Sequence, residues 1–388
     1  MASSAGTLLD RGEAPAARFD GLARAVLVFA SVRLLVLATV VGAALVAGRS
    51  PWRVLTRWDS QWYRHVAESG YGHPVLHHDG RLLSDYAFFP LLPLLERGIG
   101  SVLHVPELVA GLAISVAASL VAAAGIYVWG ARLYGPRVAM AGVLTWSLLP
   151  MAPVLWLPYS ESLFTALAVW ALYAVHHRAP VTAGVLAALA GSCRPTGAAV
   201  AVAVVVVLCR DLLCPGPPGS RPADATGRRV LGAALAPLGT VGYLGYVAWQ
   251  HGQVLGYFRV VDGWDNTVDG GQAFAAWIVR LVRDPPHWPG VLVLVGLAGA
   301  VTLLVACARQ RQPVGLLVFA FGMFTLAMIT SGYFGSKPRY LLPAFPLLFP
   351  VAEAVARMPR RTGFLVWVGA TVAAAAYGAI WLLGSGPP

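Results

Sequence analysis

The chain has 388 residues, of which 58% are hydrophobic and only 12% are charged, and its mean hydropathy is +0.69. Soluble domains carry about 25% charged residues, so this composition excludes a water-soluble globule and indicates a polytopic membrane protein. The net charge of +11 comes almost entirely from arginine, and no nucleic-acid recognition motif accompanies it. We therefore interpret the positive charge as a signal of membrane orientation and predict no nucleic-acid partner.

Residues 1–20 are predicted to form a disordered cytoplasmic tail. The first span covers about 21–47 and is too long for a cleaved signal peptide, and the arginines before it place the N-terminus in the cytoplasm. Arg33 lies nearer the inner end of this span, so we expect its side chain to snorkel toward the headgroups. Residues 48–105 then form a large first extracytoplasmic loop, whose proline-broken apolar run 86–97 is expected to lie in the interface as a helix or re-entrant segment.

Ten further spans are predicted from apolar length and from basic clusters, which mark cytoplasmic ends. They cover about 107–130, 138–157, 162–176, 181–193, 197–209, 230–250, 289–307, 313–331, 341–356 and 363–383. An inner linker, 214–228, and a second outer loop, 251–287, interrupt the series. The predicted fold class is an all-α polytopic membrane protein with about eleven transmembrane helices, whose large first extracytoplasmic loop carries interfacial helices. It is one integral domain over 21–384, followed by a short tail, 385–388.

Neither the cysteines nor the histidines have the spacing of a metal site. The four cysteines lie in or next to apolar segments and are interpreted as small core residues: Cys193, Cys209, Cys214 and Cys307. A loop cluster of histidines with one aspartate matches no ligand motif: His73, His77, His78 and Asp79. We therefore predict no metal and no other cofactor, with a divalent ion left as an alternative.

The most unusual outer stretch, 57–71, reads RWDSQWYRHVAESGY and directly follows the first span. Its acid, Asp59, stands among aromatic and basic side chains, namely Arg57, Trp58, Trp62, Tyr63 and Arg64. An ordinary interfacial aromatic belt is the alternative interpretation, since Trp and Tyr favour the headgroup level. We favour a carboxylate held at the water–lipid boundary beside cations that bind a lipid phosphate.

Three other predicted outer turns carry aromatic or charged side chains. They hold, in chain order, Tyr159, Glu161, Arg194, Lys337, Arg339 and Tyr340. Glu161 is expected either to cap the following helix or to contact substrate, and Arg194 either to anchor at the headgroups or to bind phosphate. Lys337 and Arg339 flank a proline and are the preferred cations for a donor phosphate. Tyr340 either belongs to the aromatic belt, which we favour, or stacks on substrate.

One chemistry uses all these residue types: transfer of a sugar from a lipid phosphate to an acceptor hydroxyl. A carboxylate accepts the hydroxyl proton as general base, while Arg and Lys stabilise the phosphate as it leaves. Because a phosphate leaves without being protonated, one carboxylate is sufficient, whereas glycosidases pair two carboxylates. The aromatic rings offer flat faces for a sugar and walls for a polyprenyl tail.

Four motifs, in order along nearly the whole chain, resemble a known enzyme family. They are RWDSQWY at 57–63 with GY at 70–71, FFPLLPLL at 88–95, YSESLF at 159–164 and RYLLP at 339–343. They are similar to the bacterial, mostly actinobacterial, branch of the GPI mannosyltransferase II-like family, whose eukaryotic members add the second mannose to GPI-anchor precursors. The Arg-rich, Ala/Gly/Val-rich composition suits an actinobacterium.

The resemblance implies membership of the type C glycosyltransferase superfamily and an active site at the outer face of the bacterial cytoplasmic membrane. It implies inverting transfer of mannose from polyprenyl-phosphate mannose, with Asp59 as the base. Bacteria make no GPI anchors, so the acceptor is expected to be a glycolipid or a cell-envelope glycan.

Three rival functions stay open at this point. The same scaffold could use another polyprenyl-phosphate sugar, such as arabinose, galactose or glucose. A transporter or flippase of lipid-linked sugars belongs to a different class, and such proteins often consist of matching halves with broken helices. No internal match of this kind is evident in the sequence. A catalytically silent scaffold protein is the third rival, and the retention of Asp59 in its aromatic setting argues against it.

Overall fold

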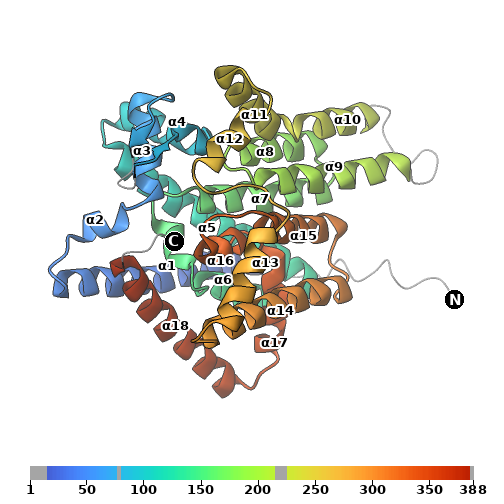
Figure 1. Cartoon of the computed structure of the whole chain (residues 1–388). Coiled ribbons are helices and arrows are strands. Elements are labelled where there is room, and N and C mark those ends of the chain that lie inside the picture. Colours follow the sequence, from blue (N-terminus) through green and yellow to red (C-terminus); the bar gives the residue numbers. More distant parts are fainter. Residues whose placement is uncertain (1–14, 77–79, 215–224, 385–388) are drawn as a thin grey trace.

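The computed structural model describes residues 15–76, 80–214 and 225–384. The protein is an all-α polytopic membrane protein whose helices pack side by side around a shared apolar core (Figure 1). In the described part the only sheet is a pair of short antiparallel strands, β1 (Val75–Leu76) and β2 (Leu82–Leu83). The predicted tail segments 1–14 and 385–388 lie outside the described residues.

Five stretches of the described chain are long and apolar enough to cross a membrane: Asp20–Val46, Glu107–Tyr134, Thr226–His251, Trp288–Arg309 and Arg360–Leu383. They correspond to α1 (Pro15–Val46), α5 (Glu107–Tyr134), α10 (Ala225–Leu235) with α11 (Leu238–His251), α14 (Trp288–Arg309) and α18 (Arg360–Leu383). A sixth span results if the two helices on either side of an 81° bend, Phe334–Leu341 and Phe345–Ala356, are counted together. The predicted count of eleven is therefore not confirmed.

Helices also form at the other predicted spans, but they are shorter than the roughly 20 residues needed to cross a bilayer straight. They are α6 (Pro136–Ser147), α7 (Ser160–His176), α8 (Pro180–Gly191), α9 (Gly197–Leu213), α15 (Val314–Ile329) and α17 (Leu348–Ala356). Proline explains one early end: Pro150 follows the last residue of α6 by three positions, and Pro153 lies in the 3₁₀ turn Ala152–Trp156 that comes next. Proline cannot donate a helical hydrogen bond and clashes with the preceding turn.

α5 is the central helix of the core and contacts α1, α4, α6 and α7. Small residues let its neighbours approach closely. A Cβ built at Gly125 would lie 2.5 Å from a methyl carbon of Val169 on α7, and one built at Gly130 would lie 2.7 Å from the Cα of Ala139 on α6. Close packing at small residues is how helices associate in lipid, where hydrophobic burial supplies little driving force between them.

Arg33 shows that the expected snorkelling is wrong. Its side chain is buried inside the helix bundle, with 2% of the residue exposed. Nη1 donates a hydrogen bond to the carbonyl of Ser147 over 3.3 Å, and the guanidinium lies 5.9 Å from the centre of the Trp156 ring. Because α6 ends at Ser147, a carbonyl there is free to accept this bond.

The predicted first outer loop, 48–105, contains short helices: α2 (Pro51–Leu55), α3 (Asp59–Ser69) and α4 (Leu91–Leu103). The predicted second outer loop, 251–287, contains α12 (Gly256–Asp262) and α13 (Gln272–Arg283). Asp85 is fully buried and organises the first loop, because its carboxylate accepts hydrogen bonds from the backbone N–H groups of Gly72 and His73 at 3.2 and 2.9 Å.

Glu96 of α4 is a second fully buried acid in the first outer loop. It packs against α5 at Gly111, where a Cβ would lie only 2.2 Å from Oε1 of Glu96. Neither carboxyl oxygen has a hydrogen-bond partner among the described residues. Burial, reinforced by the negative charge of Glu107, raises the pKa of Glu96 to about 9, so the carboxyl is protonated at neutral pH.

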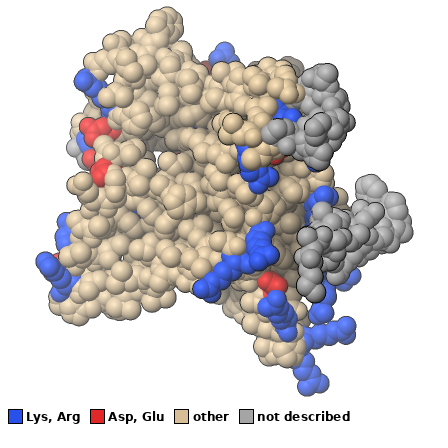
Figure 2. All heavy atoms as spheres, turned by 90° about the vertical axis from the view of Figure 1, so that its right-hand side faces the viewer, with Lys and Arg blue, Asp and Glu red and all other residues tan. Residues whose placement is uncertain are grey.

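One end of the bundle is basic. Figure 2 shows the face on the right-hand side of Figure 1, and on it Lys and Arg side chains outnumber those of Asp and Glu. Such a bias is typical of a cytoplasmic face. The interpretation of the cysteines as core residues is right for Cys193 and Cys307, which are buried, and wrong for Cys209 and Cys214, which are exposed on the surface of the chain.

Candidate functional site

Four charged side chains from distant parts of the sequence form a continuous row. The Nη2 of Arg339 lies 2.9 Å from Oδ2 of Asp59, and its Nε lies 3.2 Å from Oε1 of Glu161. The Nη1 of Arg194 lies 2.9 Å from the same Oε1. The row is therefore Asp59–Arg339–Glu161–Arg194, and we call it the charge row. Sequence analysis proposed each of these residues separately, and the structure brings them together.

Each member of the charge row lies at the start of a helix, in a turn or in a very short helix. Asp59 is the first residue of α3, and Glu161 lies in the first turn of α7. Arg194 lies in the turn between α8 and α9, and Arg339 belongs to α16 (Lys337–Leu341). Helix ends and turns can be displaced without breaking a span, which is why functional side chains are commonly placed on them.

The acids of the charge row differ in accessibility. The Asp59 side chain is 26% exposed, whereas that of Glu161 is 2% exposed and those of Arg194 and Arg339 are 8% and 10% exposed. Asp59 is thus the carboxylate that a substrate can reach. Glu161 lies behind it and contacts both guanidinium groups.

Opposite charges keep the buried members ionised. Burial alone would raise the pKa of Glu161, but Arg194 and Arg339 outweigh burial and hold that pKa below its usual value. Burial would lower the pKa of Arg339, but Asp59 and Glu161 raise it above its ordinary value. Two acids and two arginines balance, so the charge row as a whole carries no net charge.

The residue directly before Asp59, Trp58, has an unusual backbone conformation. Trp58, which precedes α3, has φ 55°, a conformation that bulky side chains rarely adopt and that costs free energy. Two tyrosine hydroxyls hold this corner: that of Tyr159 donates to the carbonyl of Arg57 at 3.2 Å, and that of Tyr63 donates to Oγ of Ser160 at 2.9 Å. The start of α3 is thereby attached to the start of α7.

Two other predicted residues of α3 lie apart from the charge row. Trp62 stacks on Phe88 with ring centres 5.5 Å apart and meets Trp264 edge-on at 4.8 Å. Arg64 faces outward and pairs with Glu68 at 3.4 Å. Trp264 was not among the predicted site residues, although its position between Asp262 and Asp265 was a usable signal.

Lys337 makes contacts that sequence analysis did not predict. Its Nζ donates to the carbonyl of Ala327 at 2.6 Å and to both the carbonyl and the hydroxyl of Thr330, and it lies 5.1 Å from the centre of the Phe274 ring. Burial, partly opposed by Asp269, lowers its pKa to about 8. Its hydrogen bonds connect α16 to the end of α15, so its expected contact with phosphate would require these bonds to rearrange.

The structure also decides between some alternatives. The N-cap of α7 is Tyr159, with no side-chain capping bond, and the carboxylate of Glu161 binds two arginines instead. Anchoring of Arg194 at the headgroups is wrong, because the residue is buried against Glu161. Tyr340 is half-buried, with its ring centre 5.9 Å from the guanidinium carbon of Arg339.

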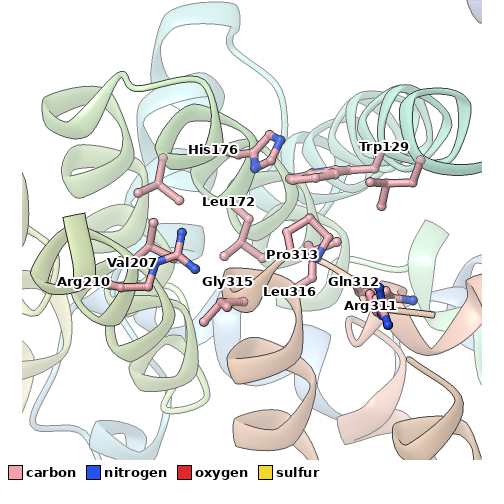
Figure 3. A pocket seen from close by; sticks show the side chains of 13 residues that line it. Trp129, Leu172, His176, Val207, Arg210, Arg311, Gln312, Pro313, Gly315 and Leu316 are labelled. Atoms are coloured by element: carbon pink, nitrogen blue, oxygen red, sulfur yellow. The ribbon is translucent and has the colours of Figure 1, made fainter. Parts of the chain in front are cut away.

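Two further features lie away from this chemistry. Among the described residues no three His, Cys, Asp or Glu side chains come together as metal ligands, and the cluster at 77–79 lies outside the described part. A cavity of about 320 Å³, shown in Figure 3, is lined by His176, Arg210 and Arg311 with mainly apolar walls. His176 ends α7, roughly 20 Å from Glu161 at 1.5 Å per residue, so this cavity belongs to the opposite end of the bundle.

No family model matches the chain, and no curated protein does. Solved structures do match. The crystal structure of ArnT from Cupriavidus metallidurans bound to undecaprenyl phosphate has a TM-score of 0.54 and 16% identity, over 90% of this chain and 63% of that one. The apo oligosaccharyltransferase of Archaeoglobus fulgidus has a TM-score of 0.51 and 13% identity, over 90% of this chain and 56% of that one.

This chain thus spans less than two thirds of the length of either structure. At these identities the likeness shows that the chain shares the fold of these two proteins and shows nothing beyond the fold. The GPI mannosyltransferase II-like family is not confirmed.

Proposed function

We propose that the chain is an inverting glycosyltransferase that moves mannose from polyprenyl-phosphate mannose to an acceptor hydroxyl. The acceptor is a glycolipid or a cell-envelope glycan, and the reaction takes place at the extracytoplasmic face of the bacterial cytoplasmic membrane. The observation that carries this proposal is the position of Asp59, an accessible carboxylate at one end of a buried charge row.

The geometry around Asp59 supports a role as general base. Arg339 occupies Oδ2, which leaves Oδ1 to accept the proton of an acceptor hydroxyl. As the hydroxyl oxygen bonds to the anomeric carbon, the bond from that carbon to the phosphate oxygen breaks and the phosphate leaves with the electron pair. Attack from the side opposite the phosphate inverts the anomeric centre. Glu161 fixes the guanidinium of Arg339, which in turn orients Asp59.

Aromatic side chains near α3 offer surfaces for the sugar. Trp62, Phe88 and Trp264 form a contiguous group, and their flat faces suit the apolar face of a hexose. In this proposal Tyr63, Tyr159 and Tyr340 border the substrate, and Arg57 and Arg339 supply the cations for its phosphate. Arg194 acts through Glu161, Lys337 contributes only if its bonds to Ala327 and Thr330 rearrange, and the outward-facing Arg64 is not a phosphate ligand.

Two lines of support apply to different parts of the proposal. The fold shared with ArnT, whose crystal structure holds undecaprenyl phosphate, supports a lipid-phosphate donor. Mannose and the acceptor rest on the sequence motifs. Another polyprenyl-phosphate sugar is the nearest alternative, and a flippase of lipid-linked sugars is the alternative from another class.

Transfer of labelled mannose from polyprenyl-phosphate mannose to membrane lipid acceptors tests the proposal. We expect Asp59→Asn to lose about 10²-fold or more in rate, because the amide keeps the size of the side chain but cannot accept the proton. Glu68→Gln is the matched control, since it changes an exposed acid of the same helix, and it should retain activity. The thermal stability of each variant shows whether it is folded.

Three results would contradict the proposal in different ways. Equal transfer by wild type and Asp59→Asn would show that Asp59 is not the general base. Transfer of another sugar in place of mannose would show that the donor carries that sugar and not mannose. Movement of the donor across the bilayer without any transfer would favour the flippase.

A further inference from the structure

A second group of cations lies just outside the charge row. A hollow of about 570 Å³ at the outer end of α1 is lined by Gly48, Arg49, Ser50, Arg53, Val54 and Arg57. Three of these six residues are arginines at four-residue spacing, and none of the six is acidic. The charge row is neutral, so the surplus positive charge of this corner of the molecule lies in the hollow.

Hydrogen bonds within the protein use only part of the capacity of these arginines. The Nη1 of Arg57 donates to the carbonyls of Leu382 and Gly384 at 3.0 and 2.9 Å, and Arg49 donates to the carbonyl of Leu383. These are carbonyls at the C-terminal end of α18, which helical bonding leaves free. A guanidinium has five N–H donors, so most of them are still available. The guanidinium of Arg53 makes no hydrogen bond or ion pair with any described residue.

Arg49 and Arg57 repel each other. Burial and, to a lesser degree, the positive charge of Arg49 lower the pKa of Arg57, and none of the six residues that line the hollow supplies a negative charge. A bound anion would relieve this repulsion. Phosphate oxygens match the planar fork of guanidinium donors and form bidentate, charge-assisted hydrogen bonds with it.

The surroundings of the hollow fit a lipid. Leu45 and Val46, the residues of α1 just before the hollow, are 62% and 92% exposed, and Ile380 near the end of α18 is 74% exposed. These apolar side chains offer a surface along which a hydrocarbon tail can lie below the arginines. On the other side, only Trp58 separates Arg57 from Asp59, so a phosphate in the hollow lies close to the proposed base.

We propose that this hollow binds the phosphate group of a lipid in the outer leaflet, with Arg49, Arg53 and Arg57 as its ligands. The phosphate can belong to the polyprenyl carrier or to a phospholipid headgroup. Only the assignment to the carrier rests on the proposed function. Binding of a lipid phosphate here does not depend on the reaction.

The test measures the affinity of the purified full chain for undecaprenyl phosphate, for phosphatidylglycerol and for inorganic phosphate. Arg53→Gln removes the guanidinium that has no other partner, so we expect the affinity for the preferred lipid to fall about tenfold without loss of thermal stability. Arg53→Lys should restore part of the affinity. Arg280→Gln is the matched control, because Arg280 is an exposed arginine of the other outer loop.

The outcomes separate the lipid sources from one another and the hollow from the proposed function. A loss confined to undecaprenyl phosphate identifies the carrier, and a loss confined to phosphatidylglycerol identifies a headgroup. Equal affinities in wild type, Arg53→Gln and Arg49→Gln for all three probes would overturn the proposal, even if Asp59→Asn abolishes transfer. If Arg53→Gln weakens lipid binding but the wild-type chain transfers no sugar, binding of a lipid phosphate in the hollow is supported and the proposed function is contradicted.

Discussion

Asp59 and Glu161 show how two carboxylates that share one arginine acquire different roles. Asp59 is partly exposed and has one oxygen free, whereas Glu161 is buried and neutralised by two guanidinium groups. This separation fits a reaction with a single base, because the leaving phosphate needs no proton. A glycosidase pair would instead have both carboxyl groups facing the substrate.

The buried pair of Glu161 and Arg194 gives a prediction about stability. Glu161→Gln leaves two buried arginines without their shared partner, and breaking such a pair typically costs about 3–5 kcal/mol. We expect Glu161→Gln to lower the free energy of unfolding by about this amount in denaturation experiments in micelles. The double variant Glu161→Gln/Arg194→Gln should be less destabilised than the sum of the two single variants. Additive effects would show that the two side chains are not coupled.

Glu96 gives a prediction about pH. Its pKa in the folded protein is about 9, against an ordinary value of 4.5, so between these values the folded state keeps a proton that the unfolded state releases. Stability attributable to Glu96 is thus fully present below about pH 4.5 and is lost as the pH rises toward 9. We expect Glu96→Gln to raise the melting temperature more at pH 8 than at pH 5. A gain that is the same at both pH values would mean that Glu96 is ionised in the folded protein.

At the level of residues, the sequence was informative where a side chain is unusual in its surroundings. Asp59 stands out because an acid lies among Trp, Tyr and Arg at a membrane boundary, and a site was predicted there. The pairing of Glu161 with Arg194 could not be predicted, because a helix end and a tight turn offer each residue a local alternative. Arg33 was misplaced for a related reason: the carbonyl that it binds is free only because α6 ends early.

Among the elements, α16 depends most visibly on one side chain. Lys337 connects α16 to the end of α15, and Arg339 follows two residues later. We expect Lys337→Gln to speed hydrogen exchange over 331–341 and to reduce transfer, because Arg339 loses its fixed position. Arg280→Gln, which also removes a positive charge from an outer loop, should change neither. Unchanged exchange in Lys337→Gln would show that other contacts hold α16.

The positions of most helices could be predicted, but their breaks could not. α5 and α18 begin and end within a few residues of the predicted spans because their apolar runs are long and bounded by charge or proline. The 3₁₀ turn at 152–156 and the 81° bend between Phe334–Leu341 and Phe345–Ala356 lie inside apolar stretches that hydropathy treats as continuous. Such breaks are tolerated in lipid only where other helices cover the freed backbone groups, and that packing is not visible in a single sequence.

For the whole molecule, the basic face in Figure 2 predicts the orientation in the membrane. Cys214, exposed at the end of α9, should react with a membrane-impermeant maleimide from the cytoplasmic side only. With Cys209 and Cys214 changed to Ser, a cysteine introduced by Gln253→Cys should react from the outside of intact cells. The opposite labelling pattern would show that the predicted orientation is wrong and that the charge row faces the cytoplasm.

The contact between the first outer loop and the end of α18 has a consequence for biosynthesis. Arg49 and Arg57 bind carbonyls at the end of α18, more than 300 residues later in the chain, so the corner preceding Asp59 lacks these supports until α18 has been made and has entered the bilayer. A nascent or truncated chain that already carries Asp59, Glu161, Arg194 and Arg339 would still have a loosely held loop. Under the proposed function, α18 therefore acts as a completion step, and we expect sugar transfer only once this helix is in place.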